Sequence, residues 1–221
     1  MLFAAFYSVW ALRTRFLRAL AWPLAAYVVF DLSMAYRSDL GLLNLLATIV
    51  DCLIYTVVAV TTHRLVLLGR GSVGPWGLTR WTARESSFFL HWVLLLLLMI
   101  ASTSVVVLLL SLLPPFAMAA GAWVCLLFIA TRFSLLFPAI AVGDRTSLKL
   151  AWRLSAKHQW QLFVVVVAFP LLLGVPLLLT TLGASIWNAL AFVLLSNLMV
   201  VFTISAVSMA YREVTQSPDK V

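Results

Sequence analysis

The most regular chemical pattern in the chain is a series of basic residues four positions apart: Arg145, Lys149, Arg153 and Lys157. Residues three and four positions apart share one face of a helix, so these side chains form a basic stripe. Leu148, Ala151 and Trp152 fall on another face. The pattern predicts an amphipathic helix that lies in a membrane interface and binds anionic lipid head groups. In the alternative interpretation, the four cations only set the orientation of the chain in the membrane.

Two more charged residues lie inside apolar segments, where an ionisable side chain costs about 2.5–3.5 kcal/mol at the centre of a membrane helix. Asp51 is in the middle of one apolar run, and Arg132 is near the end of another. The two runs would cross the membrane in the same direction, so the residues would lie at different depths. One hypothesis gives Asp51 a proton or ion role. The other keeps Asp51 protonated or hydrogen-bonded, with Arg132 extending to the inner interface.

Residues suited to catalysis or metal binding are scattered along the chain. The histidines lie in separate segments, and the cysteines form no CxxC pattern; they are His63, His91, His158, Cys52 and Cys125. The glycine-rich loop 69–85 has no lysine of the kind that a phosphate-binding loop requires, so we interpret it as a flexible linker. We therefore expect no enzymatic activity, no metal and no cofactor.

The composition indicates which elements position these residues. Of the 221 residues, 64% are hydrophobic and 10% are charged, whereas a soluble domain has about 25% charged residues. A water-soluble globular protein is excluded, and 1–221 is predicted to be a single integral membrane domain. The net charge of +8 comes from short clusters of cations between the apolar segments, so nucleic-acid binding is not expected.

The apolar segments divide into membrane-spanning lengths, for which a helix needs about 20 residues. Two long stretches without charged residues each hold two such helices, separated at Pro114-Pro115 and at 182–185. Two further apolar stretches precede them. We predict an all-α bundle of six transmembrane helices, at 19–36, 40–63, 88–113, 116–138, 160–182 and 186–209.

The segment before the first predicted span has aromatic residues at helical spacing and a cluster of arginines: Phe3, Phe6, Tyr7, Trp10, Arg13, Arg15 and Arg18. It predicts an N-terminal interfacial helix. Pro23 then suits the first turn of the next helix.

Small and helix-breaking residues mark two of the later spans. Pro170, Gly174 and Pro176 predict a kink in the fifth span. An Ala-x-x-x-Gly pattern that ends at Gly121 predicts the close approach of a neighbouring helix.

The 15 cations fall on alternate connections between the predicted spans. All of them except Arg37 and Arg132 lie before the first span, between spans two and three, between spans four and five, or after span six. Because such clusters face the cytoplasm, both termini and these connections are predicted to be cytoplasmic.

The run 132–144, followed by 147–155, resembles a signature of one bacterial family. In that family an Arg on an apolar helix leads to a Pro, here Pro138, then to a short polar turn and a helix with Ala-Trp or Ser-Trp, here Ala151-Trp152. The family contains YciC-like inner-membrane proteins and the membrane domain attached to some glycerophosphodiester phosphodiesterases. The resemblance implies a helical fold in the bacterial inner membrane. The 221 residues contain no phosphodiesterase domain, so it implies no catalytic activity.

Three functions are compatible with these patterns. The first, which we expect, is a non-catalytic inner-membrane protein, a helper or structural component that organises lipid or a larger membrane complex. Its partners would be anionic membrane lipids and other membrane proteins. The second is a small permease for an ion or solute, suggested by Asp51 and the interrupted fifth span. The third is a lipid-modifying enzyme, for which no nucleophile–base pair is evident.

Overall fold

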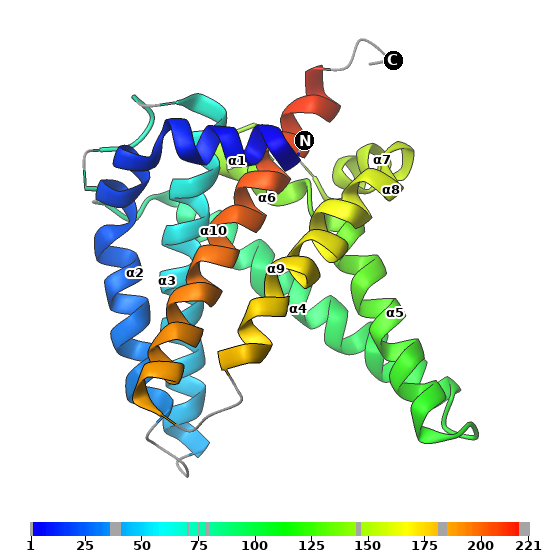
Figure 1. Cartoon of the computed structure of the whole chain (residues 1–221). Coiled ribbons are helices and arrows are strands. Elements are labelled where there is room, and N and C mark those ends of the chain that lie inside the picture. Colours follow the sequence, from blue (N-terminus) through cyan, green and yellow to red (C-terminus); the bar gives the residue numbers. More distant parts are fainter. Residues whose placement is uncertain are drawn as a thin grey trace.

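The computed structural model describes residues 2–35, 41–69, 71–74, 76–77, 80–144, 147–180 and 185–216. In this part of the chain the fold is all-helical (Figure 1). In chain order the elements are α1 (Leu2–Ala11), α2 (Arg13–Ala35), α3 (Gly41–Leu68), α4 (Ala83–Leu109), α5 (Pro115–Phe133), α6 (Leu136–Val142), α7 (Leu148–Lys157), α8 (Gln159–Phe163), the π-helix η1 (Val164–Ala168), α9 (Phe169–Thr180) and α10 (Ile186–Gln216).

Five helical segments of the described chain are long and apolar enough to cross a membrane. They are Leu46–Leu68, Ala83–Leu109, Pro115–Val142, Gln159–Thr180 and Trp187–Gln216. These segments confirm the helices predicted for spans two to six. The first predicted span, 19–36, falls on α2, which is not among the five and which carries three arginines in its first turns. That span therefore stays a prediction.

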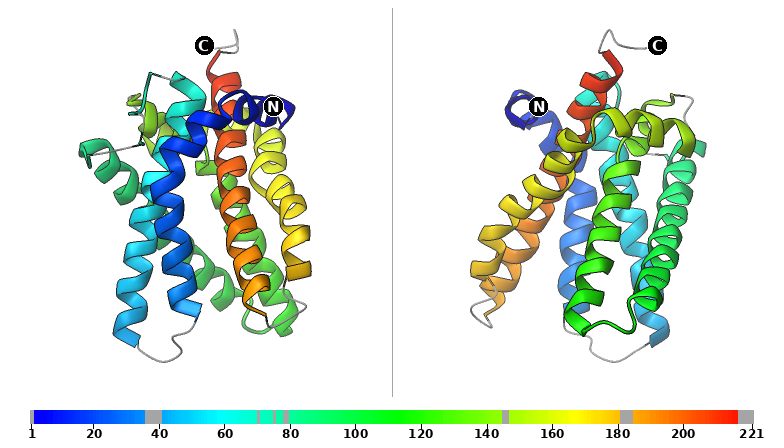
Figure 2. Two further views of the ribbon diagram at one scale, coloured as in Figure 1. Left: turned by 60° about the vertical axis from the view of Figure 1, so that its left-hand side comes forward. Right: turned by 90° about the vertical axis from the view of Figure 1, so that its right-hand side faces the viewer.

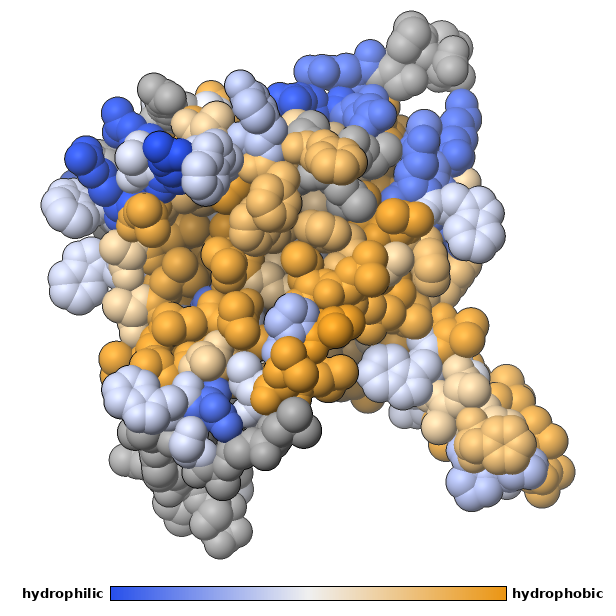
Figure 3. All heavy atoms as spheres, in the orientation of Figure 1, coloured by the Kyte–Doolittle hydropathy of each residue, from blue (hydrophilic) through white to orange (hydrophobic). Residues whose placement is uncertain are grey.

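The polar ends of the helices lie on one side of the molecule. Figures 1 and 2 show α1, α7 and the last turns of α10 at the same end, with the long helices extending away from it. Figure 3 shows hydrophilic side chains over this end and mostly apolar side chains below it. The large apolar side chains that remain exposed include Leu97, Leu108, Leu112, Leu171 and Leu179. Such a surface is unfavourable in water and suits a hydrocarbon solvent.

The prediction that Pro23 begins a helix is wrong, because α2 begins at Arg13 and contains Pro23 in its interior. A proline inside a helix has no N–H for the carbonyl group four residues earlier, which here belongs to Ala19. The loop residue Gly77 packs directly against that carbonyl group. A Cβ atom at Gly77 would lie 2.2 Å from the Ala19 oxygen, and the φ angle of Gly77 is +86°. The freed carbonyl group is thus covered by a residue that has no side chain.

We expect Gly77→Ala to lower stability more than any other Gly→Ala change in the same loop. A left-handed φ costs a side-chain-bearing residue about 1–2 kcal/mol, and a clash in a packed site adds about 1–3 kcal/mol. Thermal unfolding of the purified protein in detergent measures the loss. Gly143→Ala is the matched control, since Gly143 has a φ of +83° but no atom within 4 Å of an added Cβ. Equal losses in both variants would contradict close packing of Gly77 on α2.

The described part of the loop between α3 and α4 is held by specific hydrogen bonds. The Arg64 guanidinium donates to the Ser72 carbonyl oxygen at 2.8 and 3.1 Å and to the Ala141 carbonyl oxygen at 3.2 Å. The Ser72 hydroxyl group donates to the carbonyl oxygen of Gly69 at 2.7 Å. The loop was predicted to be a flexible linker, but these contacts tie its described part to α3, and Arg64 also joins α3 to the end of α6.

Helices α4 and α5 form an antiparallel hairpin. The hairpin turns at Pro114-Pro115, as predicted, with Pro115 at the first position of α5. A Cβ atom at Gly121 would lie 2.4 Å from Cδ1 of Leu110, so the predicted close approach of a neighbouring helix is confirmed. At its start, α4 has a capping box in which the Thr82 N–H donates to the Glu85 carboxylate at 2.7 Å.

The fifth span departs from α-helical geometry one turn earlier than predicted. Helices α8 and α9 are joined by the π-helix η1, in which the Phe169 N–H donates to the carbonyl oxygen of Val164. The wide turn ends just before Pro170. A proline ring crowds the carbonyl group four residues before it, and a π-turn is one way to absorb such a disturbance. The structure therefore places the irregularity at Val164–Ala168, whereas the sequence pointed to 170–176.

Candidate functional site

The predicted basic helix is confirmed as α7. Its first turn is capped by Ser147, whose hydroxyl group accepts a hydrogen bond from the Leu150 N–H at 3.2 Å. Lys149, Arg153 and Lys157 are exposed on one face. Arg145, the fourth residue of the predicted stripe, lies outside the described residues.

The opposite face of α7 packs onto the bundle. Ala151 and Ser155 are fully buried, and Leu148 packs with Ala151 in a hydrophobic cluster that also contains Phe88 and Leu136. Because this face is fixed on the core, the basic face of α7 points away from it. The chain then turns at His158, whose Nδ1 lies 3.0 Å from Oε1 of Gln161, and continues into α8.

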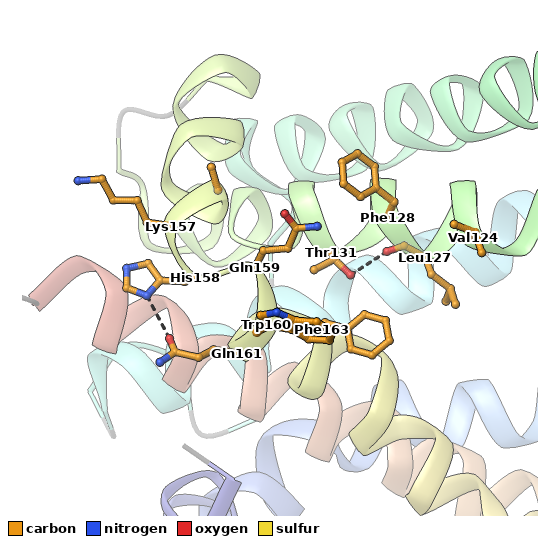
Figure 4. A pocket seen from close by; sticks show the side chains of 11 residues that line it. Val124, Leu127, Phe128, Thr131, Lys157, His158, Gln159, Trp160, Gln161 and Phe163 are labelled. Atoms are coloured by element: carbon orange, nitrogen blue, oxygen red, sulfur yellow. Dashed lines mark hydrogen bonds between the residues drawn. The ribbon is translucent and has the colours of Figure 1, made fainter.

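A cleft of about 860 Å³ lies between α5 and the turn from α7 to α8 (Figure 4). One wall is apolar and comes from Val124, Leu127 and Phe128 of α5. The opposite wall is formed by the Trp160 and Phe163 rings, which make an edge-to-face contact with centroids 5.8 Å apart. Figure 4 shows these two walls facing each other.

One end of the cleft is polar. Lys157, His158, Gln159 and Gln161 line it there, and Figure 4 shows the Lys157 ammonium group pointing away from the apolar walls. The only hydroxyl group among the lining side chains, that of Thr131, donates to the Leu127 carbonyl oxygen at 2.7 Å. The cleft therefore has an apolar body and a polar, cationic end, a division that matches an amphiphile.

Arg132 follows the cleft residue Thr131 on α5 and contacts the cleft residue Phe128, but does not itself line the cleft. Its side chain is only 8% exposed, and its guanidinium carbon lies 4.1 Å from the Trp152 ring centroid and 5.6 Å from that of Phe128. Stacking on aromatic faces contributes about 0.5–2 kcal/mol. In the described part of the chain, no carboxylate lies within 4 Å of Arg132 and its Nε has no hydrogen-bond partner. A buried cation without a counterion is unfavourable, so this position favours an anion.

The hypothesis that Arg132 extends to the inner interface stays a prediction; in the structure its guanidinium packs against Trp152 of α7. Arg132 and the basic stripe, which were separate features of the sequence, are brought together by the contact with Trp152. The structure does not bring Asp51 to Arg132, since the described residues contain no ion pair between them. Asp51 is half-buried on α3, and its Oδ1 has no hydrogen-bond partner among the described residues.

Two polar contacts at the same end of the bundle were not found from the sequence. The Tyr211 hydroxyl group on α10 donates to Oδ2 of Asp144 at 2.5 Å and so fixes the segment that leads into α7. His63 on α3 has its Nδ1 2.7 Å from the Ser208 Oγ on α10. In each pair the two residues are far apart in the sequence. The one signal in the sequence was a polar residue inside an apolar run, which indicates that a partner is needed but not which residue it is.

No protein-family model, curated protein or solved structure matches this chain.

Proposed function

We propose that the protein is a non-catalytic polytopic membrane protein that holds an anionic lipid at the cleft between α5 and the α7–α8 turn. In this way it would organise lipid for itself or for a larger membrane complex. The observation that carries the proposal is the buried guanidinium of Arg132, which has no counterion in the described chain and contacts Phe128 in the wall of an amphipathic cleft. A lipid phosphate supplies the missing anion, and an acyl chain matches the apolar walls.

The proposed arrangement has six spans in a bacterial inner membrane, with α2 as the first of them. In it, α1 and α7 lie in the cytoplasmic interface, and both termini are cytoplasmic. Support comes from the clustering of hydrophilic side chains at the end of the molecule that carries α1 and α7 (Figure 3). The resemblance to YciC-like proteins agrees with this location, and we propose membership of that family on the residues 132–155 that carry it.

The lipid head group would lie at the polar end of the cleft, near Lys157 and the exposed face of α7. Each cation close to a membrane surface contributes about 1 kcal/mol to the attraction of anionic lipid. Arg132 contributes more strongly per charge because it is shielded from water, where Coulomb interactions are weakest. Phe128 belongs both to the cleft wall and to the aromatic pair around Arg132, so it connects the acyl-chain site to the charge.

A small permease is the second candidate, and one observation favours it. The Oδ1 atom of Asp51 is buried without a hydrogen-bond partner among the described residues, which is a typical environment of a proton or ion site. Solute or proton flux in proteoliposomes, measured for the wild type and for Asp51→Asn, separates this candidate from the first. Flux that depends on Asp51 would favour the permease.

We expect the variant Lys149→Gln, Arg153→Gln, Lys157→Gln to retain much less anionic lipid than the wild type. Removing three surface cations weakens the attraction by up to about 3 kcal/mol. The measurement is the phosphatidylglycerol and cardiolipin that co-purify with each protein after extraction in mild detergent.

The matched control removes three cations elsewhere, by Arg13→Gln, Arg15→Gln and Arg18→Gln at the start of α2. This control changes the net charge by the same amount. A difference in retained lipid between the two variants therefore depends on where the cations lie and not on how many are removed. If both variants retain as much lipid as the wild type, the cations of α7 serve only in orientation. If both lose lipid equally, the cleft is not a specific site.

A further inference from the structure

A second, smaller cavity of about 210 Å³ lies in the middle of the bundle, separate from the cleft. Four aromatic side chains contribute to its wall: Tyr55 of α3, Phe88 and Trp92 of α4, and Phe137 of α6. The Phe88 and Phe137 rings are 5.0 Å apart between centroids, and Tyr55 and Trp92 are 6.4 Å apart. The rings are in contact with each other in two pairs, so they give the cavity an aromatic wall that favours an apolar or aromatic ligand.

His63 is the most buried ionisable group in the wall of this cavity, with 3% of its surface exposed. Its hydrogen bond defines its tautomer. The Ser208 hydroxyl group donates its one hydrogen to the Ile204 carbonyl oxygen at 2.8 Å, so at 2.7 Å from His63 its oxygen can only accept. Both contacts are hydrogen bonds only if Nδ1 of His63 carries the proton, so we assign this tautomer, in which Nε2 carries the lone pair.

The Nε2 atom of His63 has no hydrogen-bond donor in the part of the chain that the structure describes. An unpaired acceptor on a side chain that lines a cavity favours a ligand that donates a hydrogen bond. The other polar groups of the lining side chains are the Tyr55 hydroxyl, the Trp92 indole N–H and the hydroxyl groups of Ser134 and Thr203. The Ser134 hydroxyl group already donates to the Thr131 carbonyl oxygen at 2.9 Å, so it presents only an acceptor as well. No charged side chain lines the cavity, which disfavours an ionic ligand.

The position of the cavity indicates how a ligand would reach it. It is lined from α4 on one side and from α10 on another, and these helices diverge toward the end of the molecule opposite α1 (Figures 1 and 2). Only 6% of the apolar stretch of α4 is buried in the molecule. Most of α4 therefore faces the surroundings of the bundle, so the cavity wall that α4 supplies lies beside the hydrocarbon.

We propose that this cavity binds the ring of a membrane-soluble quinol, an aromatic diol on an apolar tail. The ring would pack among the four aromatic side chains, and one hydroxyl group would donate to Nε2 of His63. The tail would leave beside α4 into the lipid. The proposal concerns binding only, and it is independent of the lipid at the α5–α7 cleft.

The test uses a decyl-tailed benzoquinol, kept reduced, and the matching quinone, each titrated into the purified full-length protein in nanodiscs. Binding is measured by thermal shift and by calorimetry. We expect saturable binding of one quinol per chain and about tenfold weaker binding of the quinone, which has no hydroxyl group to donate; tenfold corresponds to about 1.4 kcal/mol, the upper part of the range for one neutral hydrogen bond. Equal affinities for quinol and quinone, or no saturable binding, would overturn the proposal.

The variant His63→Asn places an amide donor near the position of Nδ1, so the contact with Ser208 is retained while the acceptor Nε2 is removed. We expect it to bind quinol about tenfold more weakly and to lose the preference for quinol over quinone. His91→Asn is the matched control, because the hydrogen bonds of His91 on α4 go to Ser87 of the same helix and His91 does not line the cavity. Unchanged quinol binding by His63→Asn would contradict the role of His63.

A second variant does not depend on the stability of His63→Asn. Ala130→Leu adds bulk to the cavity wall from α5 and should abolish quinol binding; full binding by a folded Ala130→Leu protein would rule out this cavity. The variant with three glutamines on α7 should bind quinol like the wild type. The experiments can therefore contradict the quinol site without contradicting the lipid site, and the reverse.

Discussion

A cysteine introduced by Gly71→Cys should react with a membrane-impermeant maleimide only after the inner face of the membrane is exposed, whereas Ser185→Cys should react from outside. This difference in labelling is the largest effect that we expect, because from a given side of the membrane each cysteine is either accessible to the reagent or inaccessible. Gly71 is exposed between α3 and α4, and Ser185 is exposed at the start of α10. The cations on alternate connections predict that these two sites lie on opposite sides of the membrane. A third site, Gln216→Cys at the end of α10, should behave like Gly71→Cys.

The labelling experiment uses a background with Cys52→Ala and Cys125→Ala, since both native cysteines are free thiols. Intact cells, inverted vesicles and detergent-solubilised protein are compared for each site. Labelling of the Gly71 and Ser185 positions from the same side would rule out the proposed six spans. Labelling of Gly71→Cys from outside and Ser185→Cys from inside would invert the orientation and leave the number of spans unchanged.

Replacement of Arg132 should separate the effects of charge on stability and on lipid binding. Without anionic lipid, we expect Arg132→Leu to unfold at the same temperature as the wild type or higher, since it removes a buried cation without a counterion. With excess phosphatidylglycerol, the wild type should gain about 2.7 kcal/mol at 100 times the dissociation constant, and the variant should gain little. The effect of the mutation on stability therefore changes sign with the lipid. Thermal unfolding in nanodiscs of each lipid composition measures it.

Arg132→Lys is the matched variant, because it keeps the positive charge and loses the planar group that stacks on Trp152. We expect Arg132→Lys to keep part of the increase in stability with phosphatidylglycerol and to lose the stacking contact with Trp152. Nanodiscs of phosphatidylcholine alone serve as the neutral-lipid control. If Arg132→Leu is strongly destabilised in every lipid, the side chain has a packing role between α5 and α7. An undiminished response of Arg132→Leu to phosphatidylglycerol would show that Arg132 does not bind the lipid.

The sequence by itself determined the properties that depend on residues close together in the chain. Apolar length and the break at Pro114-Pro115 predicted five of the helices that the structure describes, because a helix satisfies its backbone groups locally and an apolar surface needs no particular neighbour. The periodicity of the basic residues predicted α7, since side chains three and four residues apart meet on one face whatever the surrounding fold. Gly121 predicted close helix packing for the same local reason.

Only the tertiary structure decided which polar residues meet. The sequence placed Pro23 at the start of a helix, and the structure keeps it inside α2, where Gly77 from a later loop covers the freed carbonyl group. It gave His63 no partner, and the fold brings Ser208 to it.

The candidate site shows the same division between local pattern and packing. The basic stripe of α7 was evident in the sequence, but the stacking of Arg132 on Trp152 and the cleft beside Phe128 were not. Their positions depend on how α5, α7 and α8 pack, and a uniformly apolar helix surface specifies few unique contacts. Hydrogen bonds and charges require particular geometry, so the contacts of each polar residue were fixed only when the helices packed together.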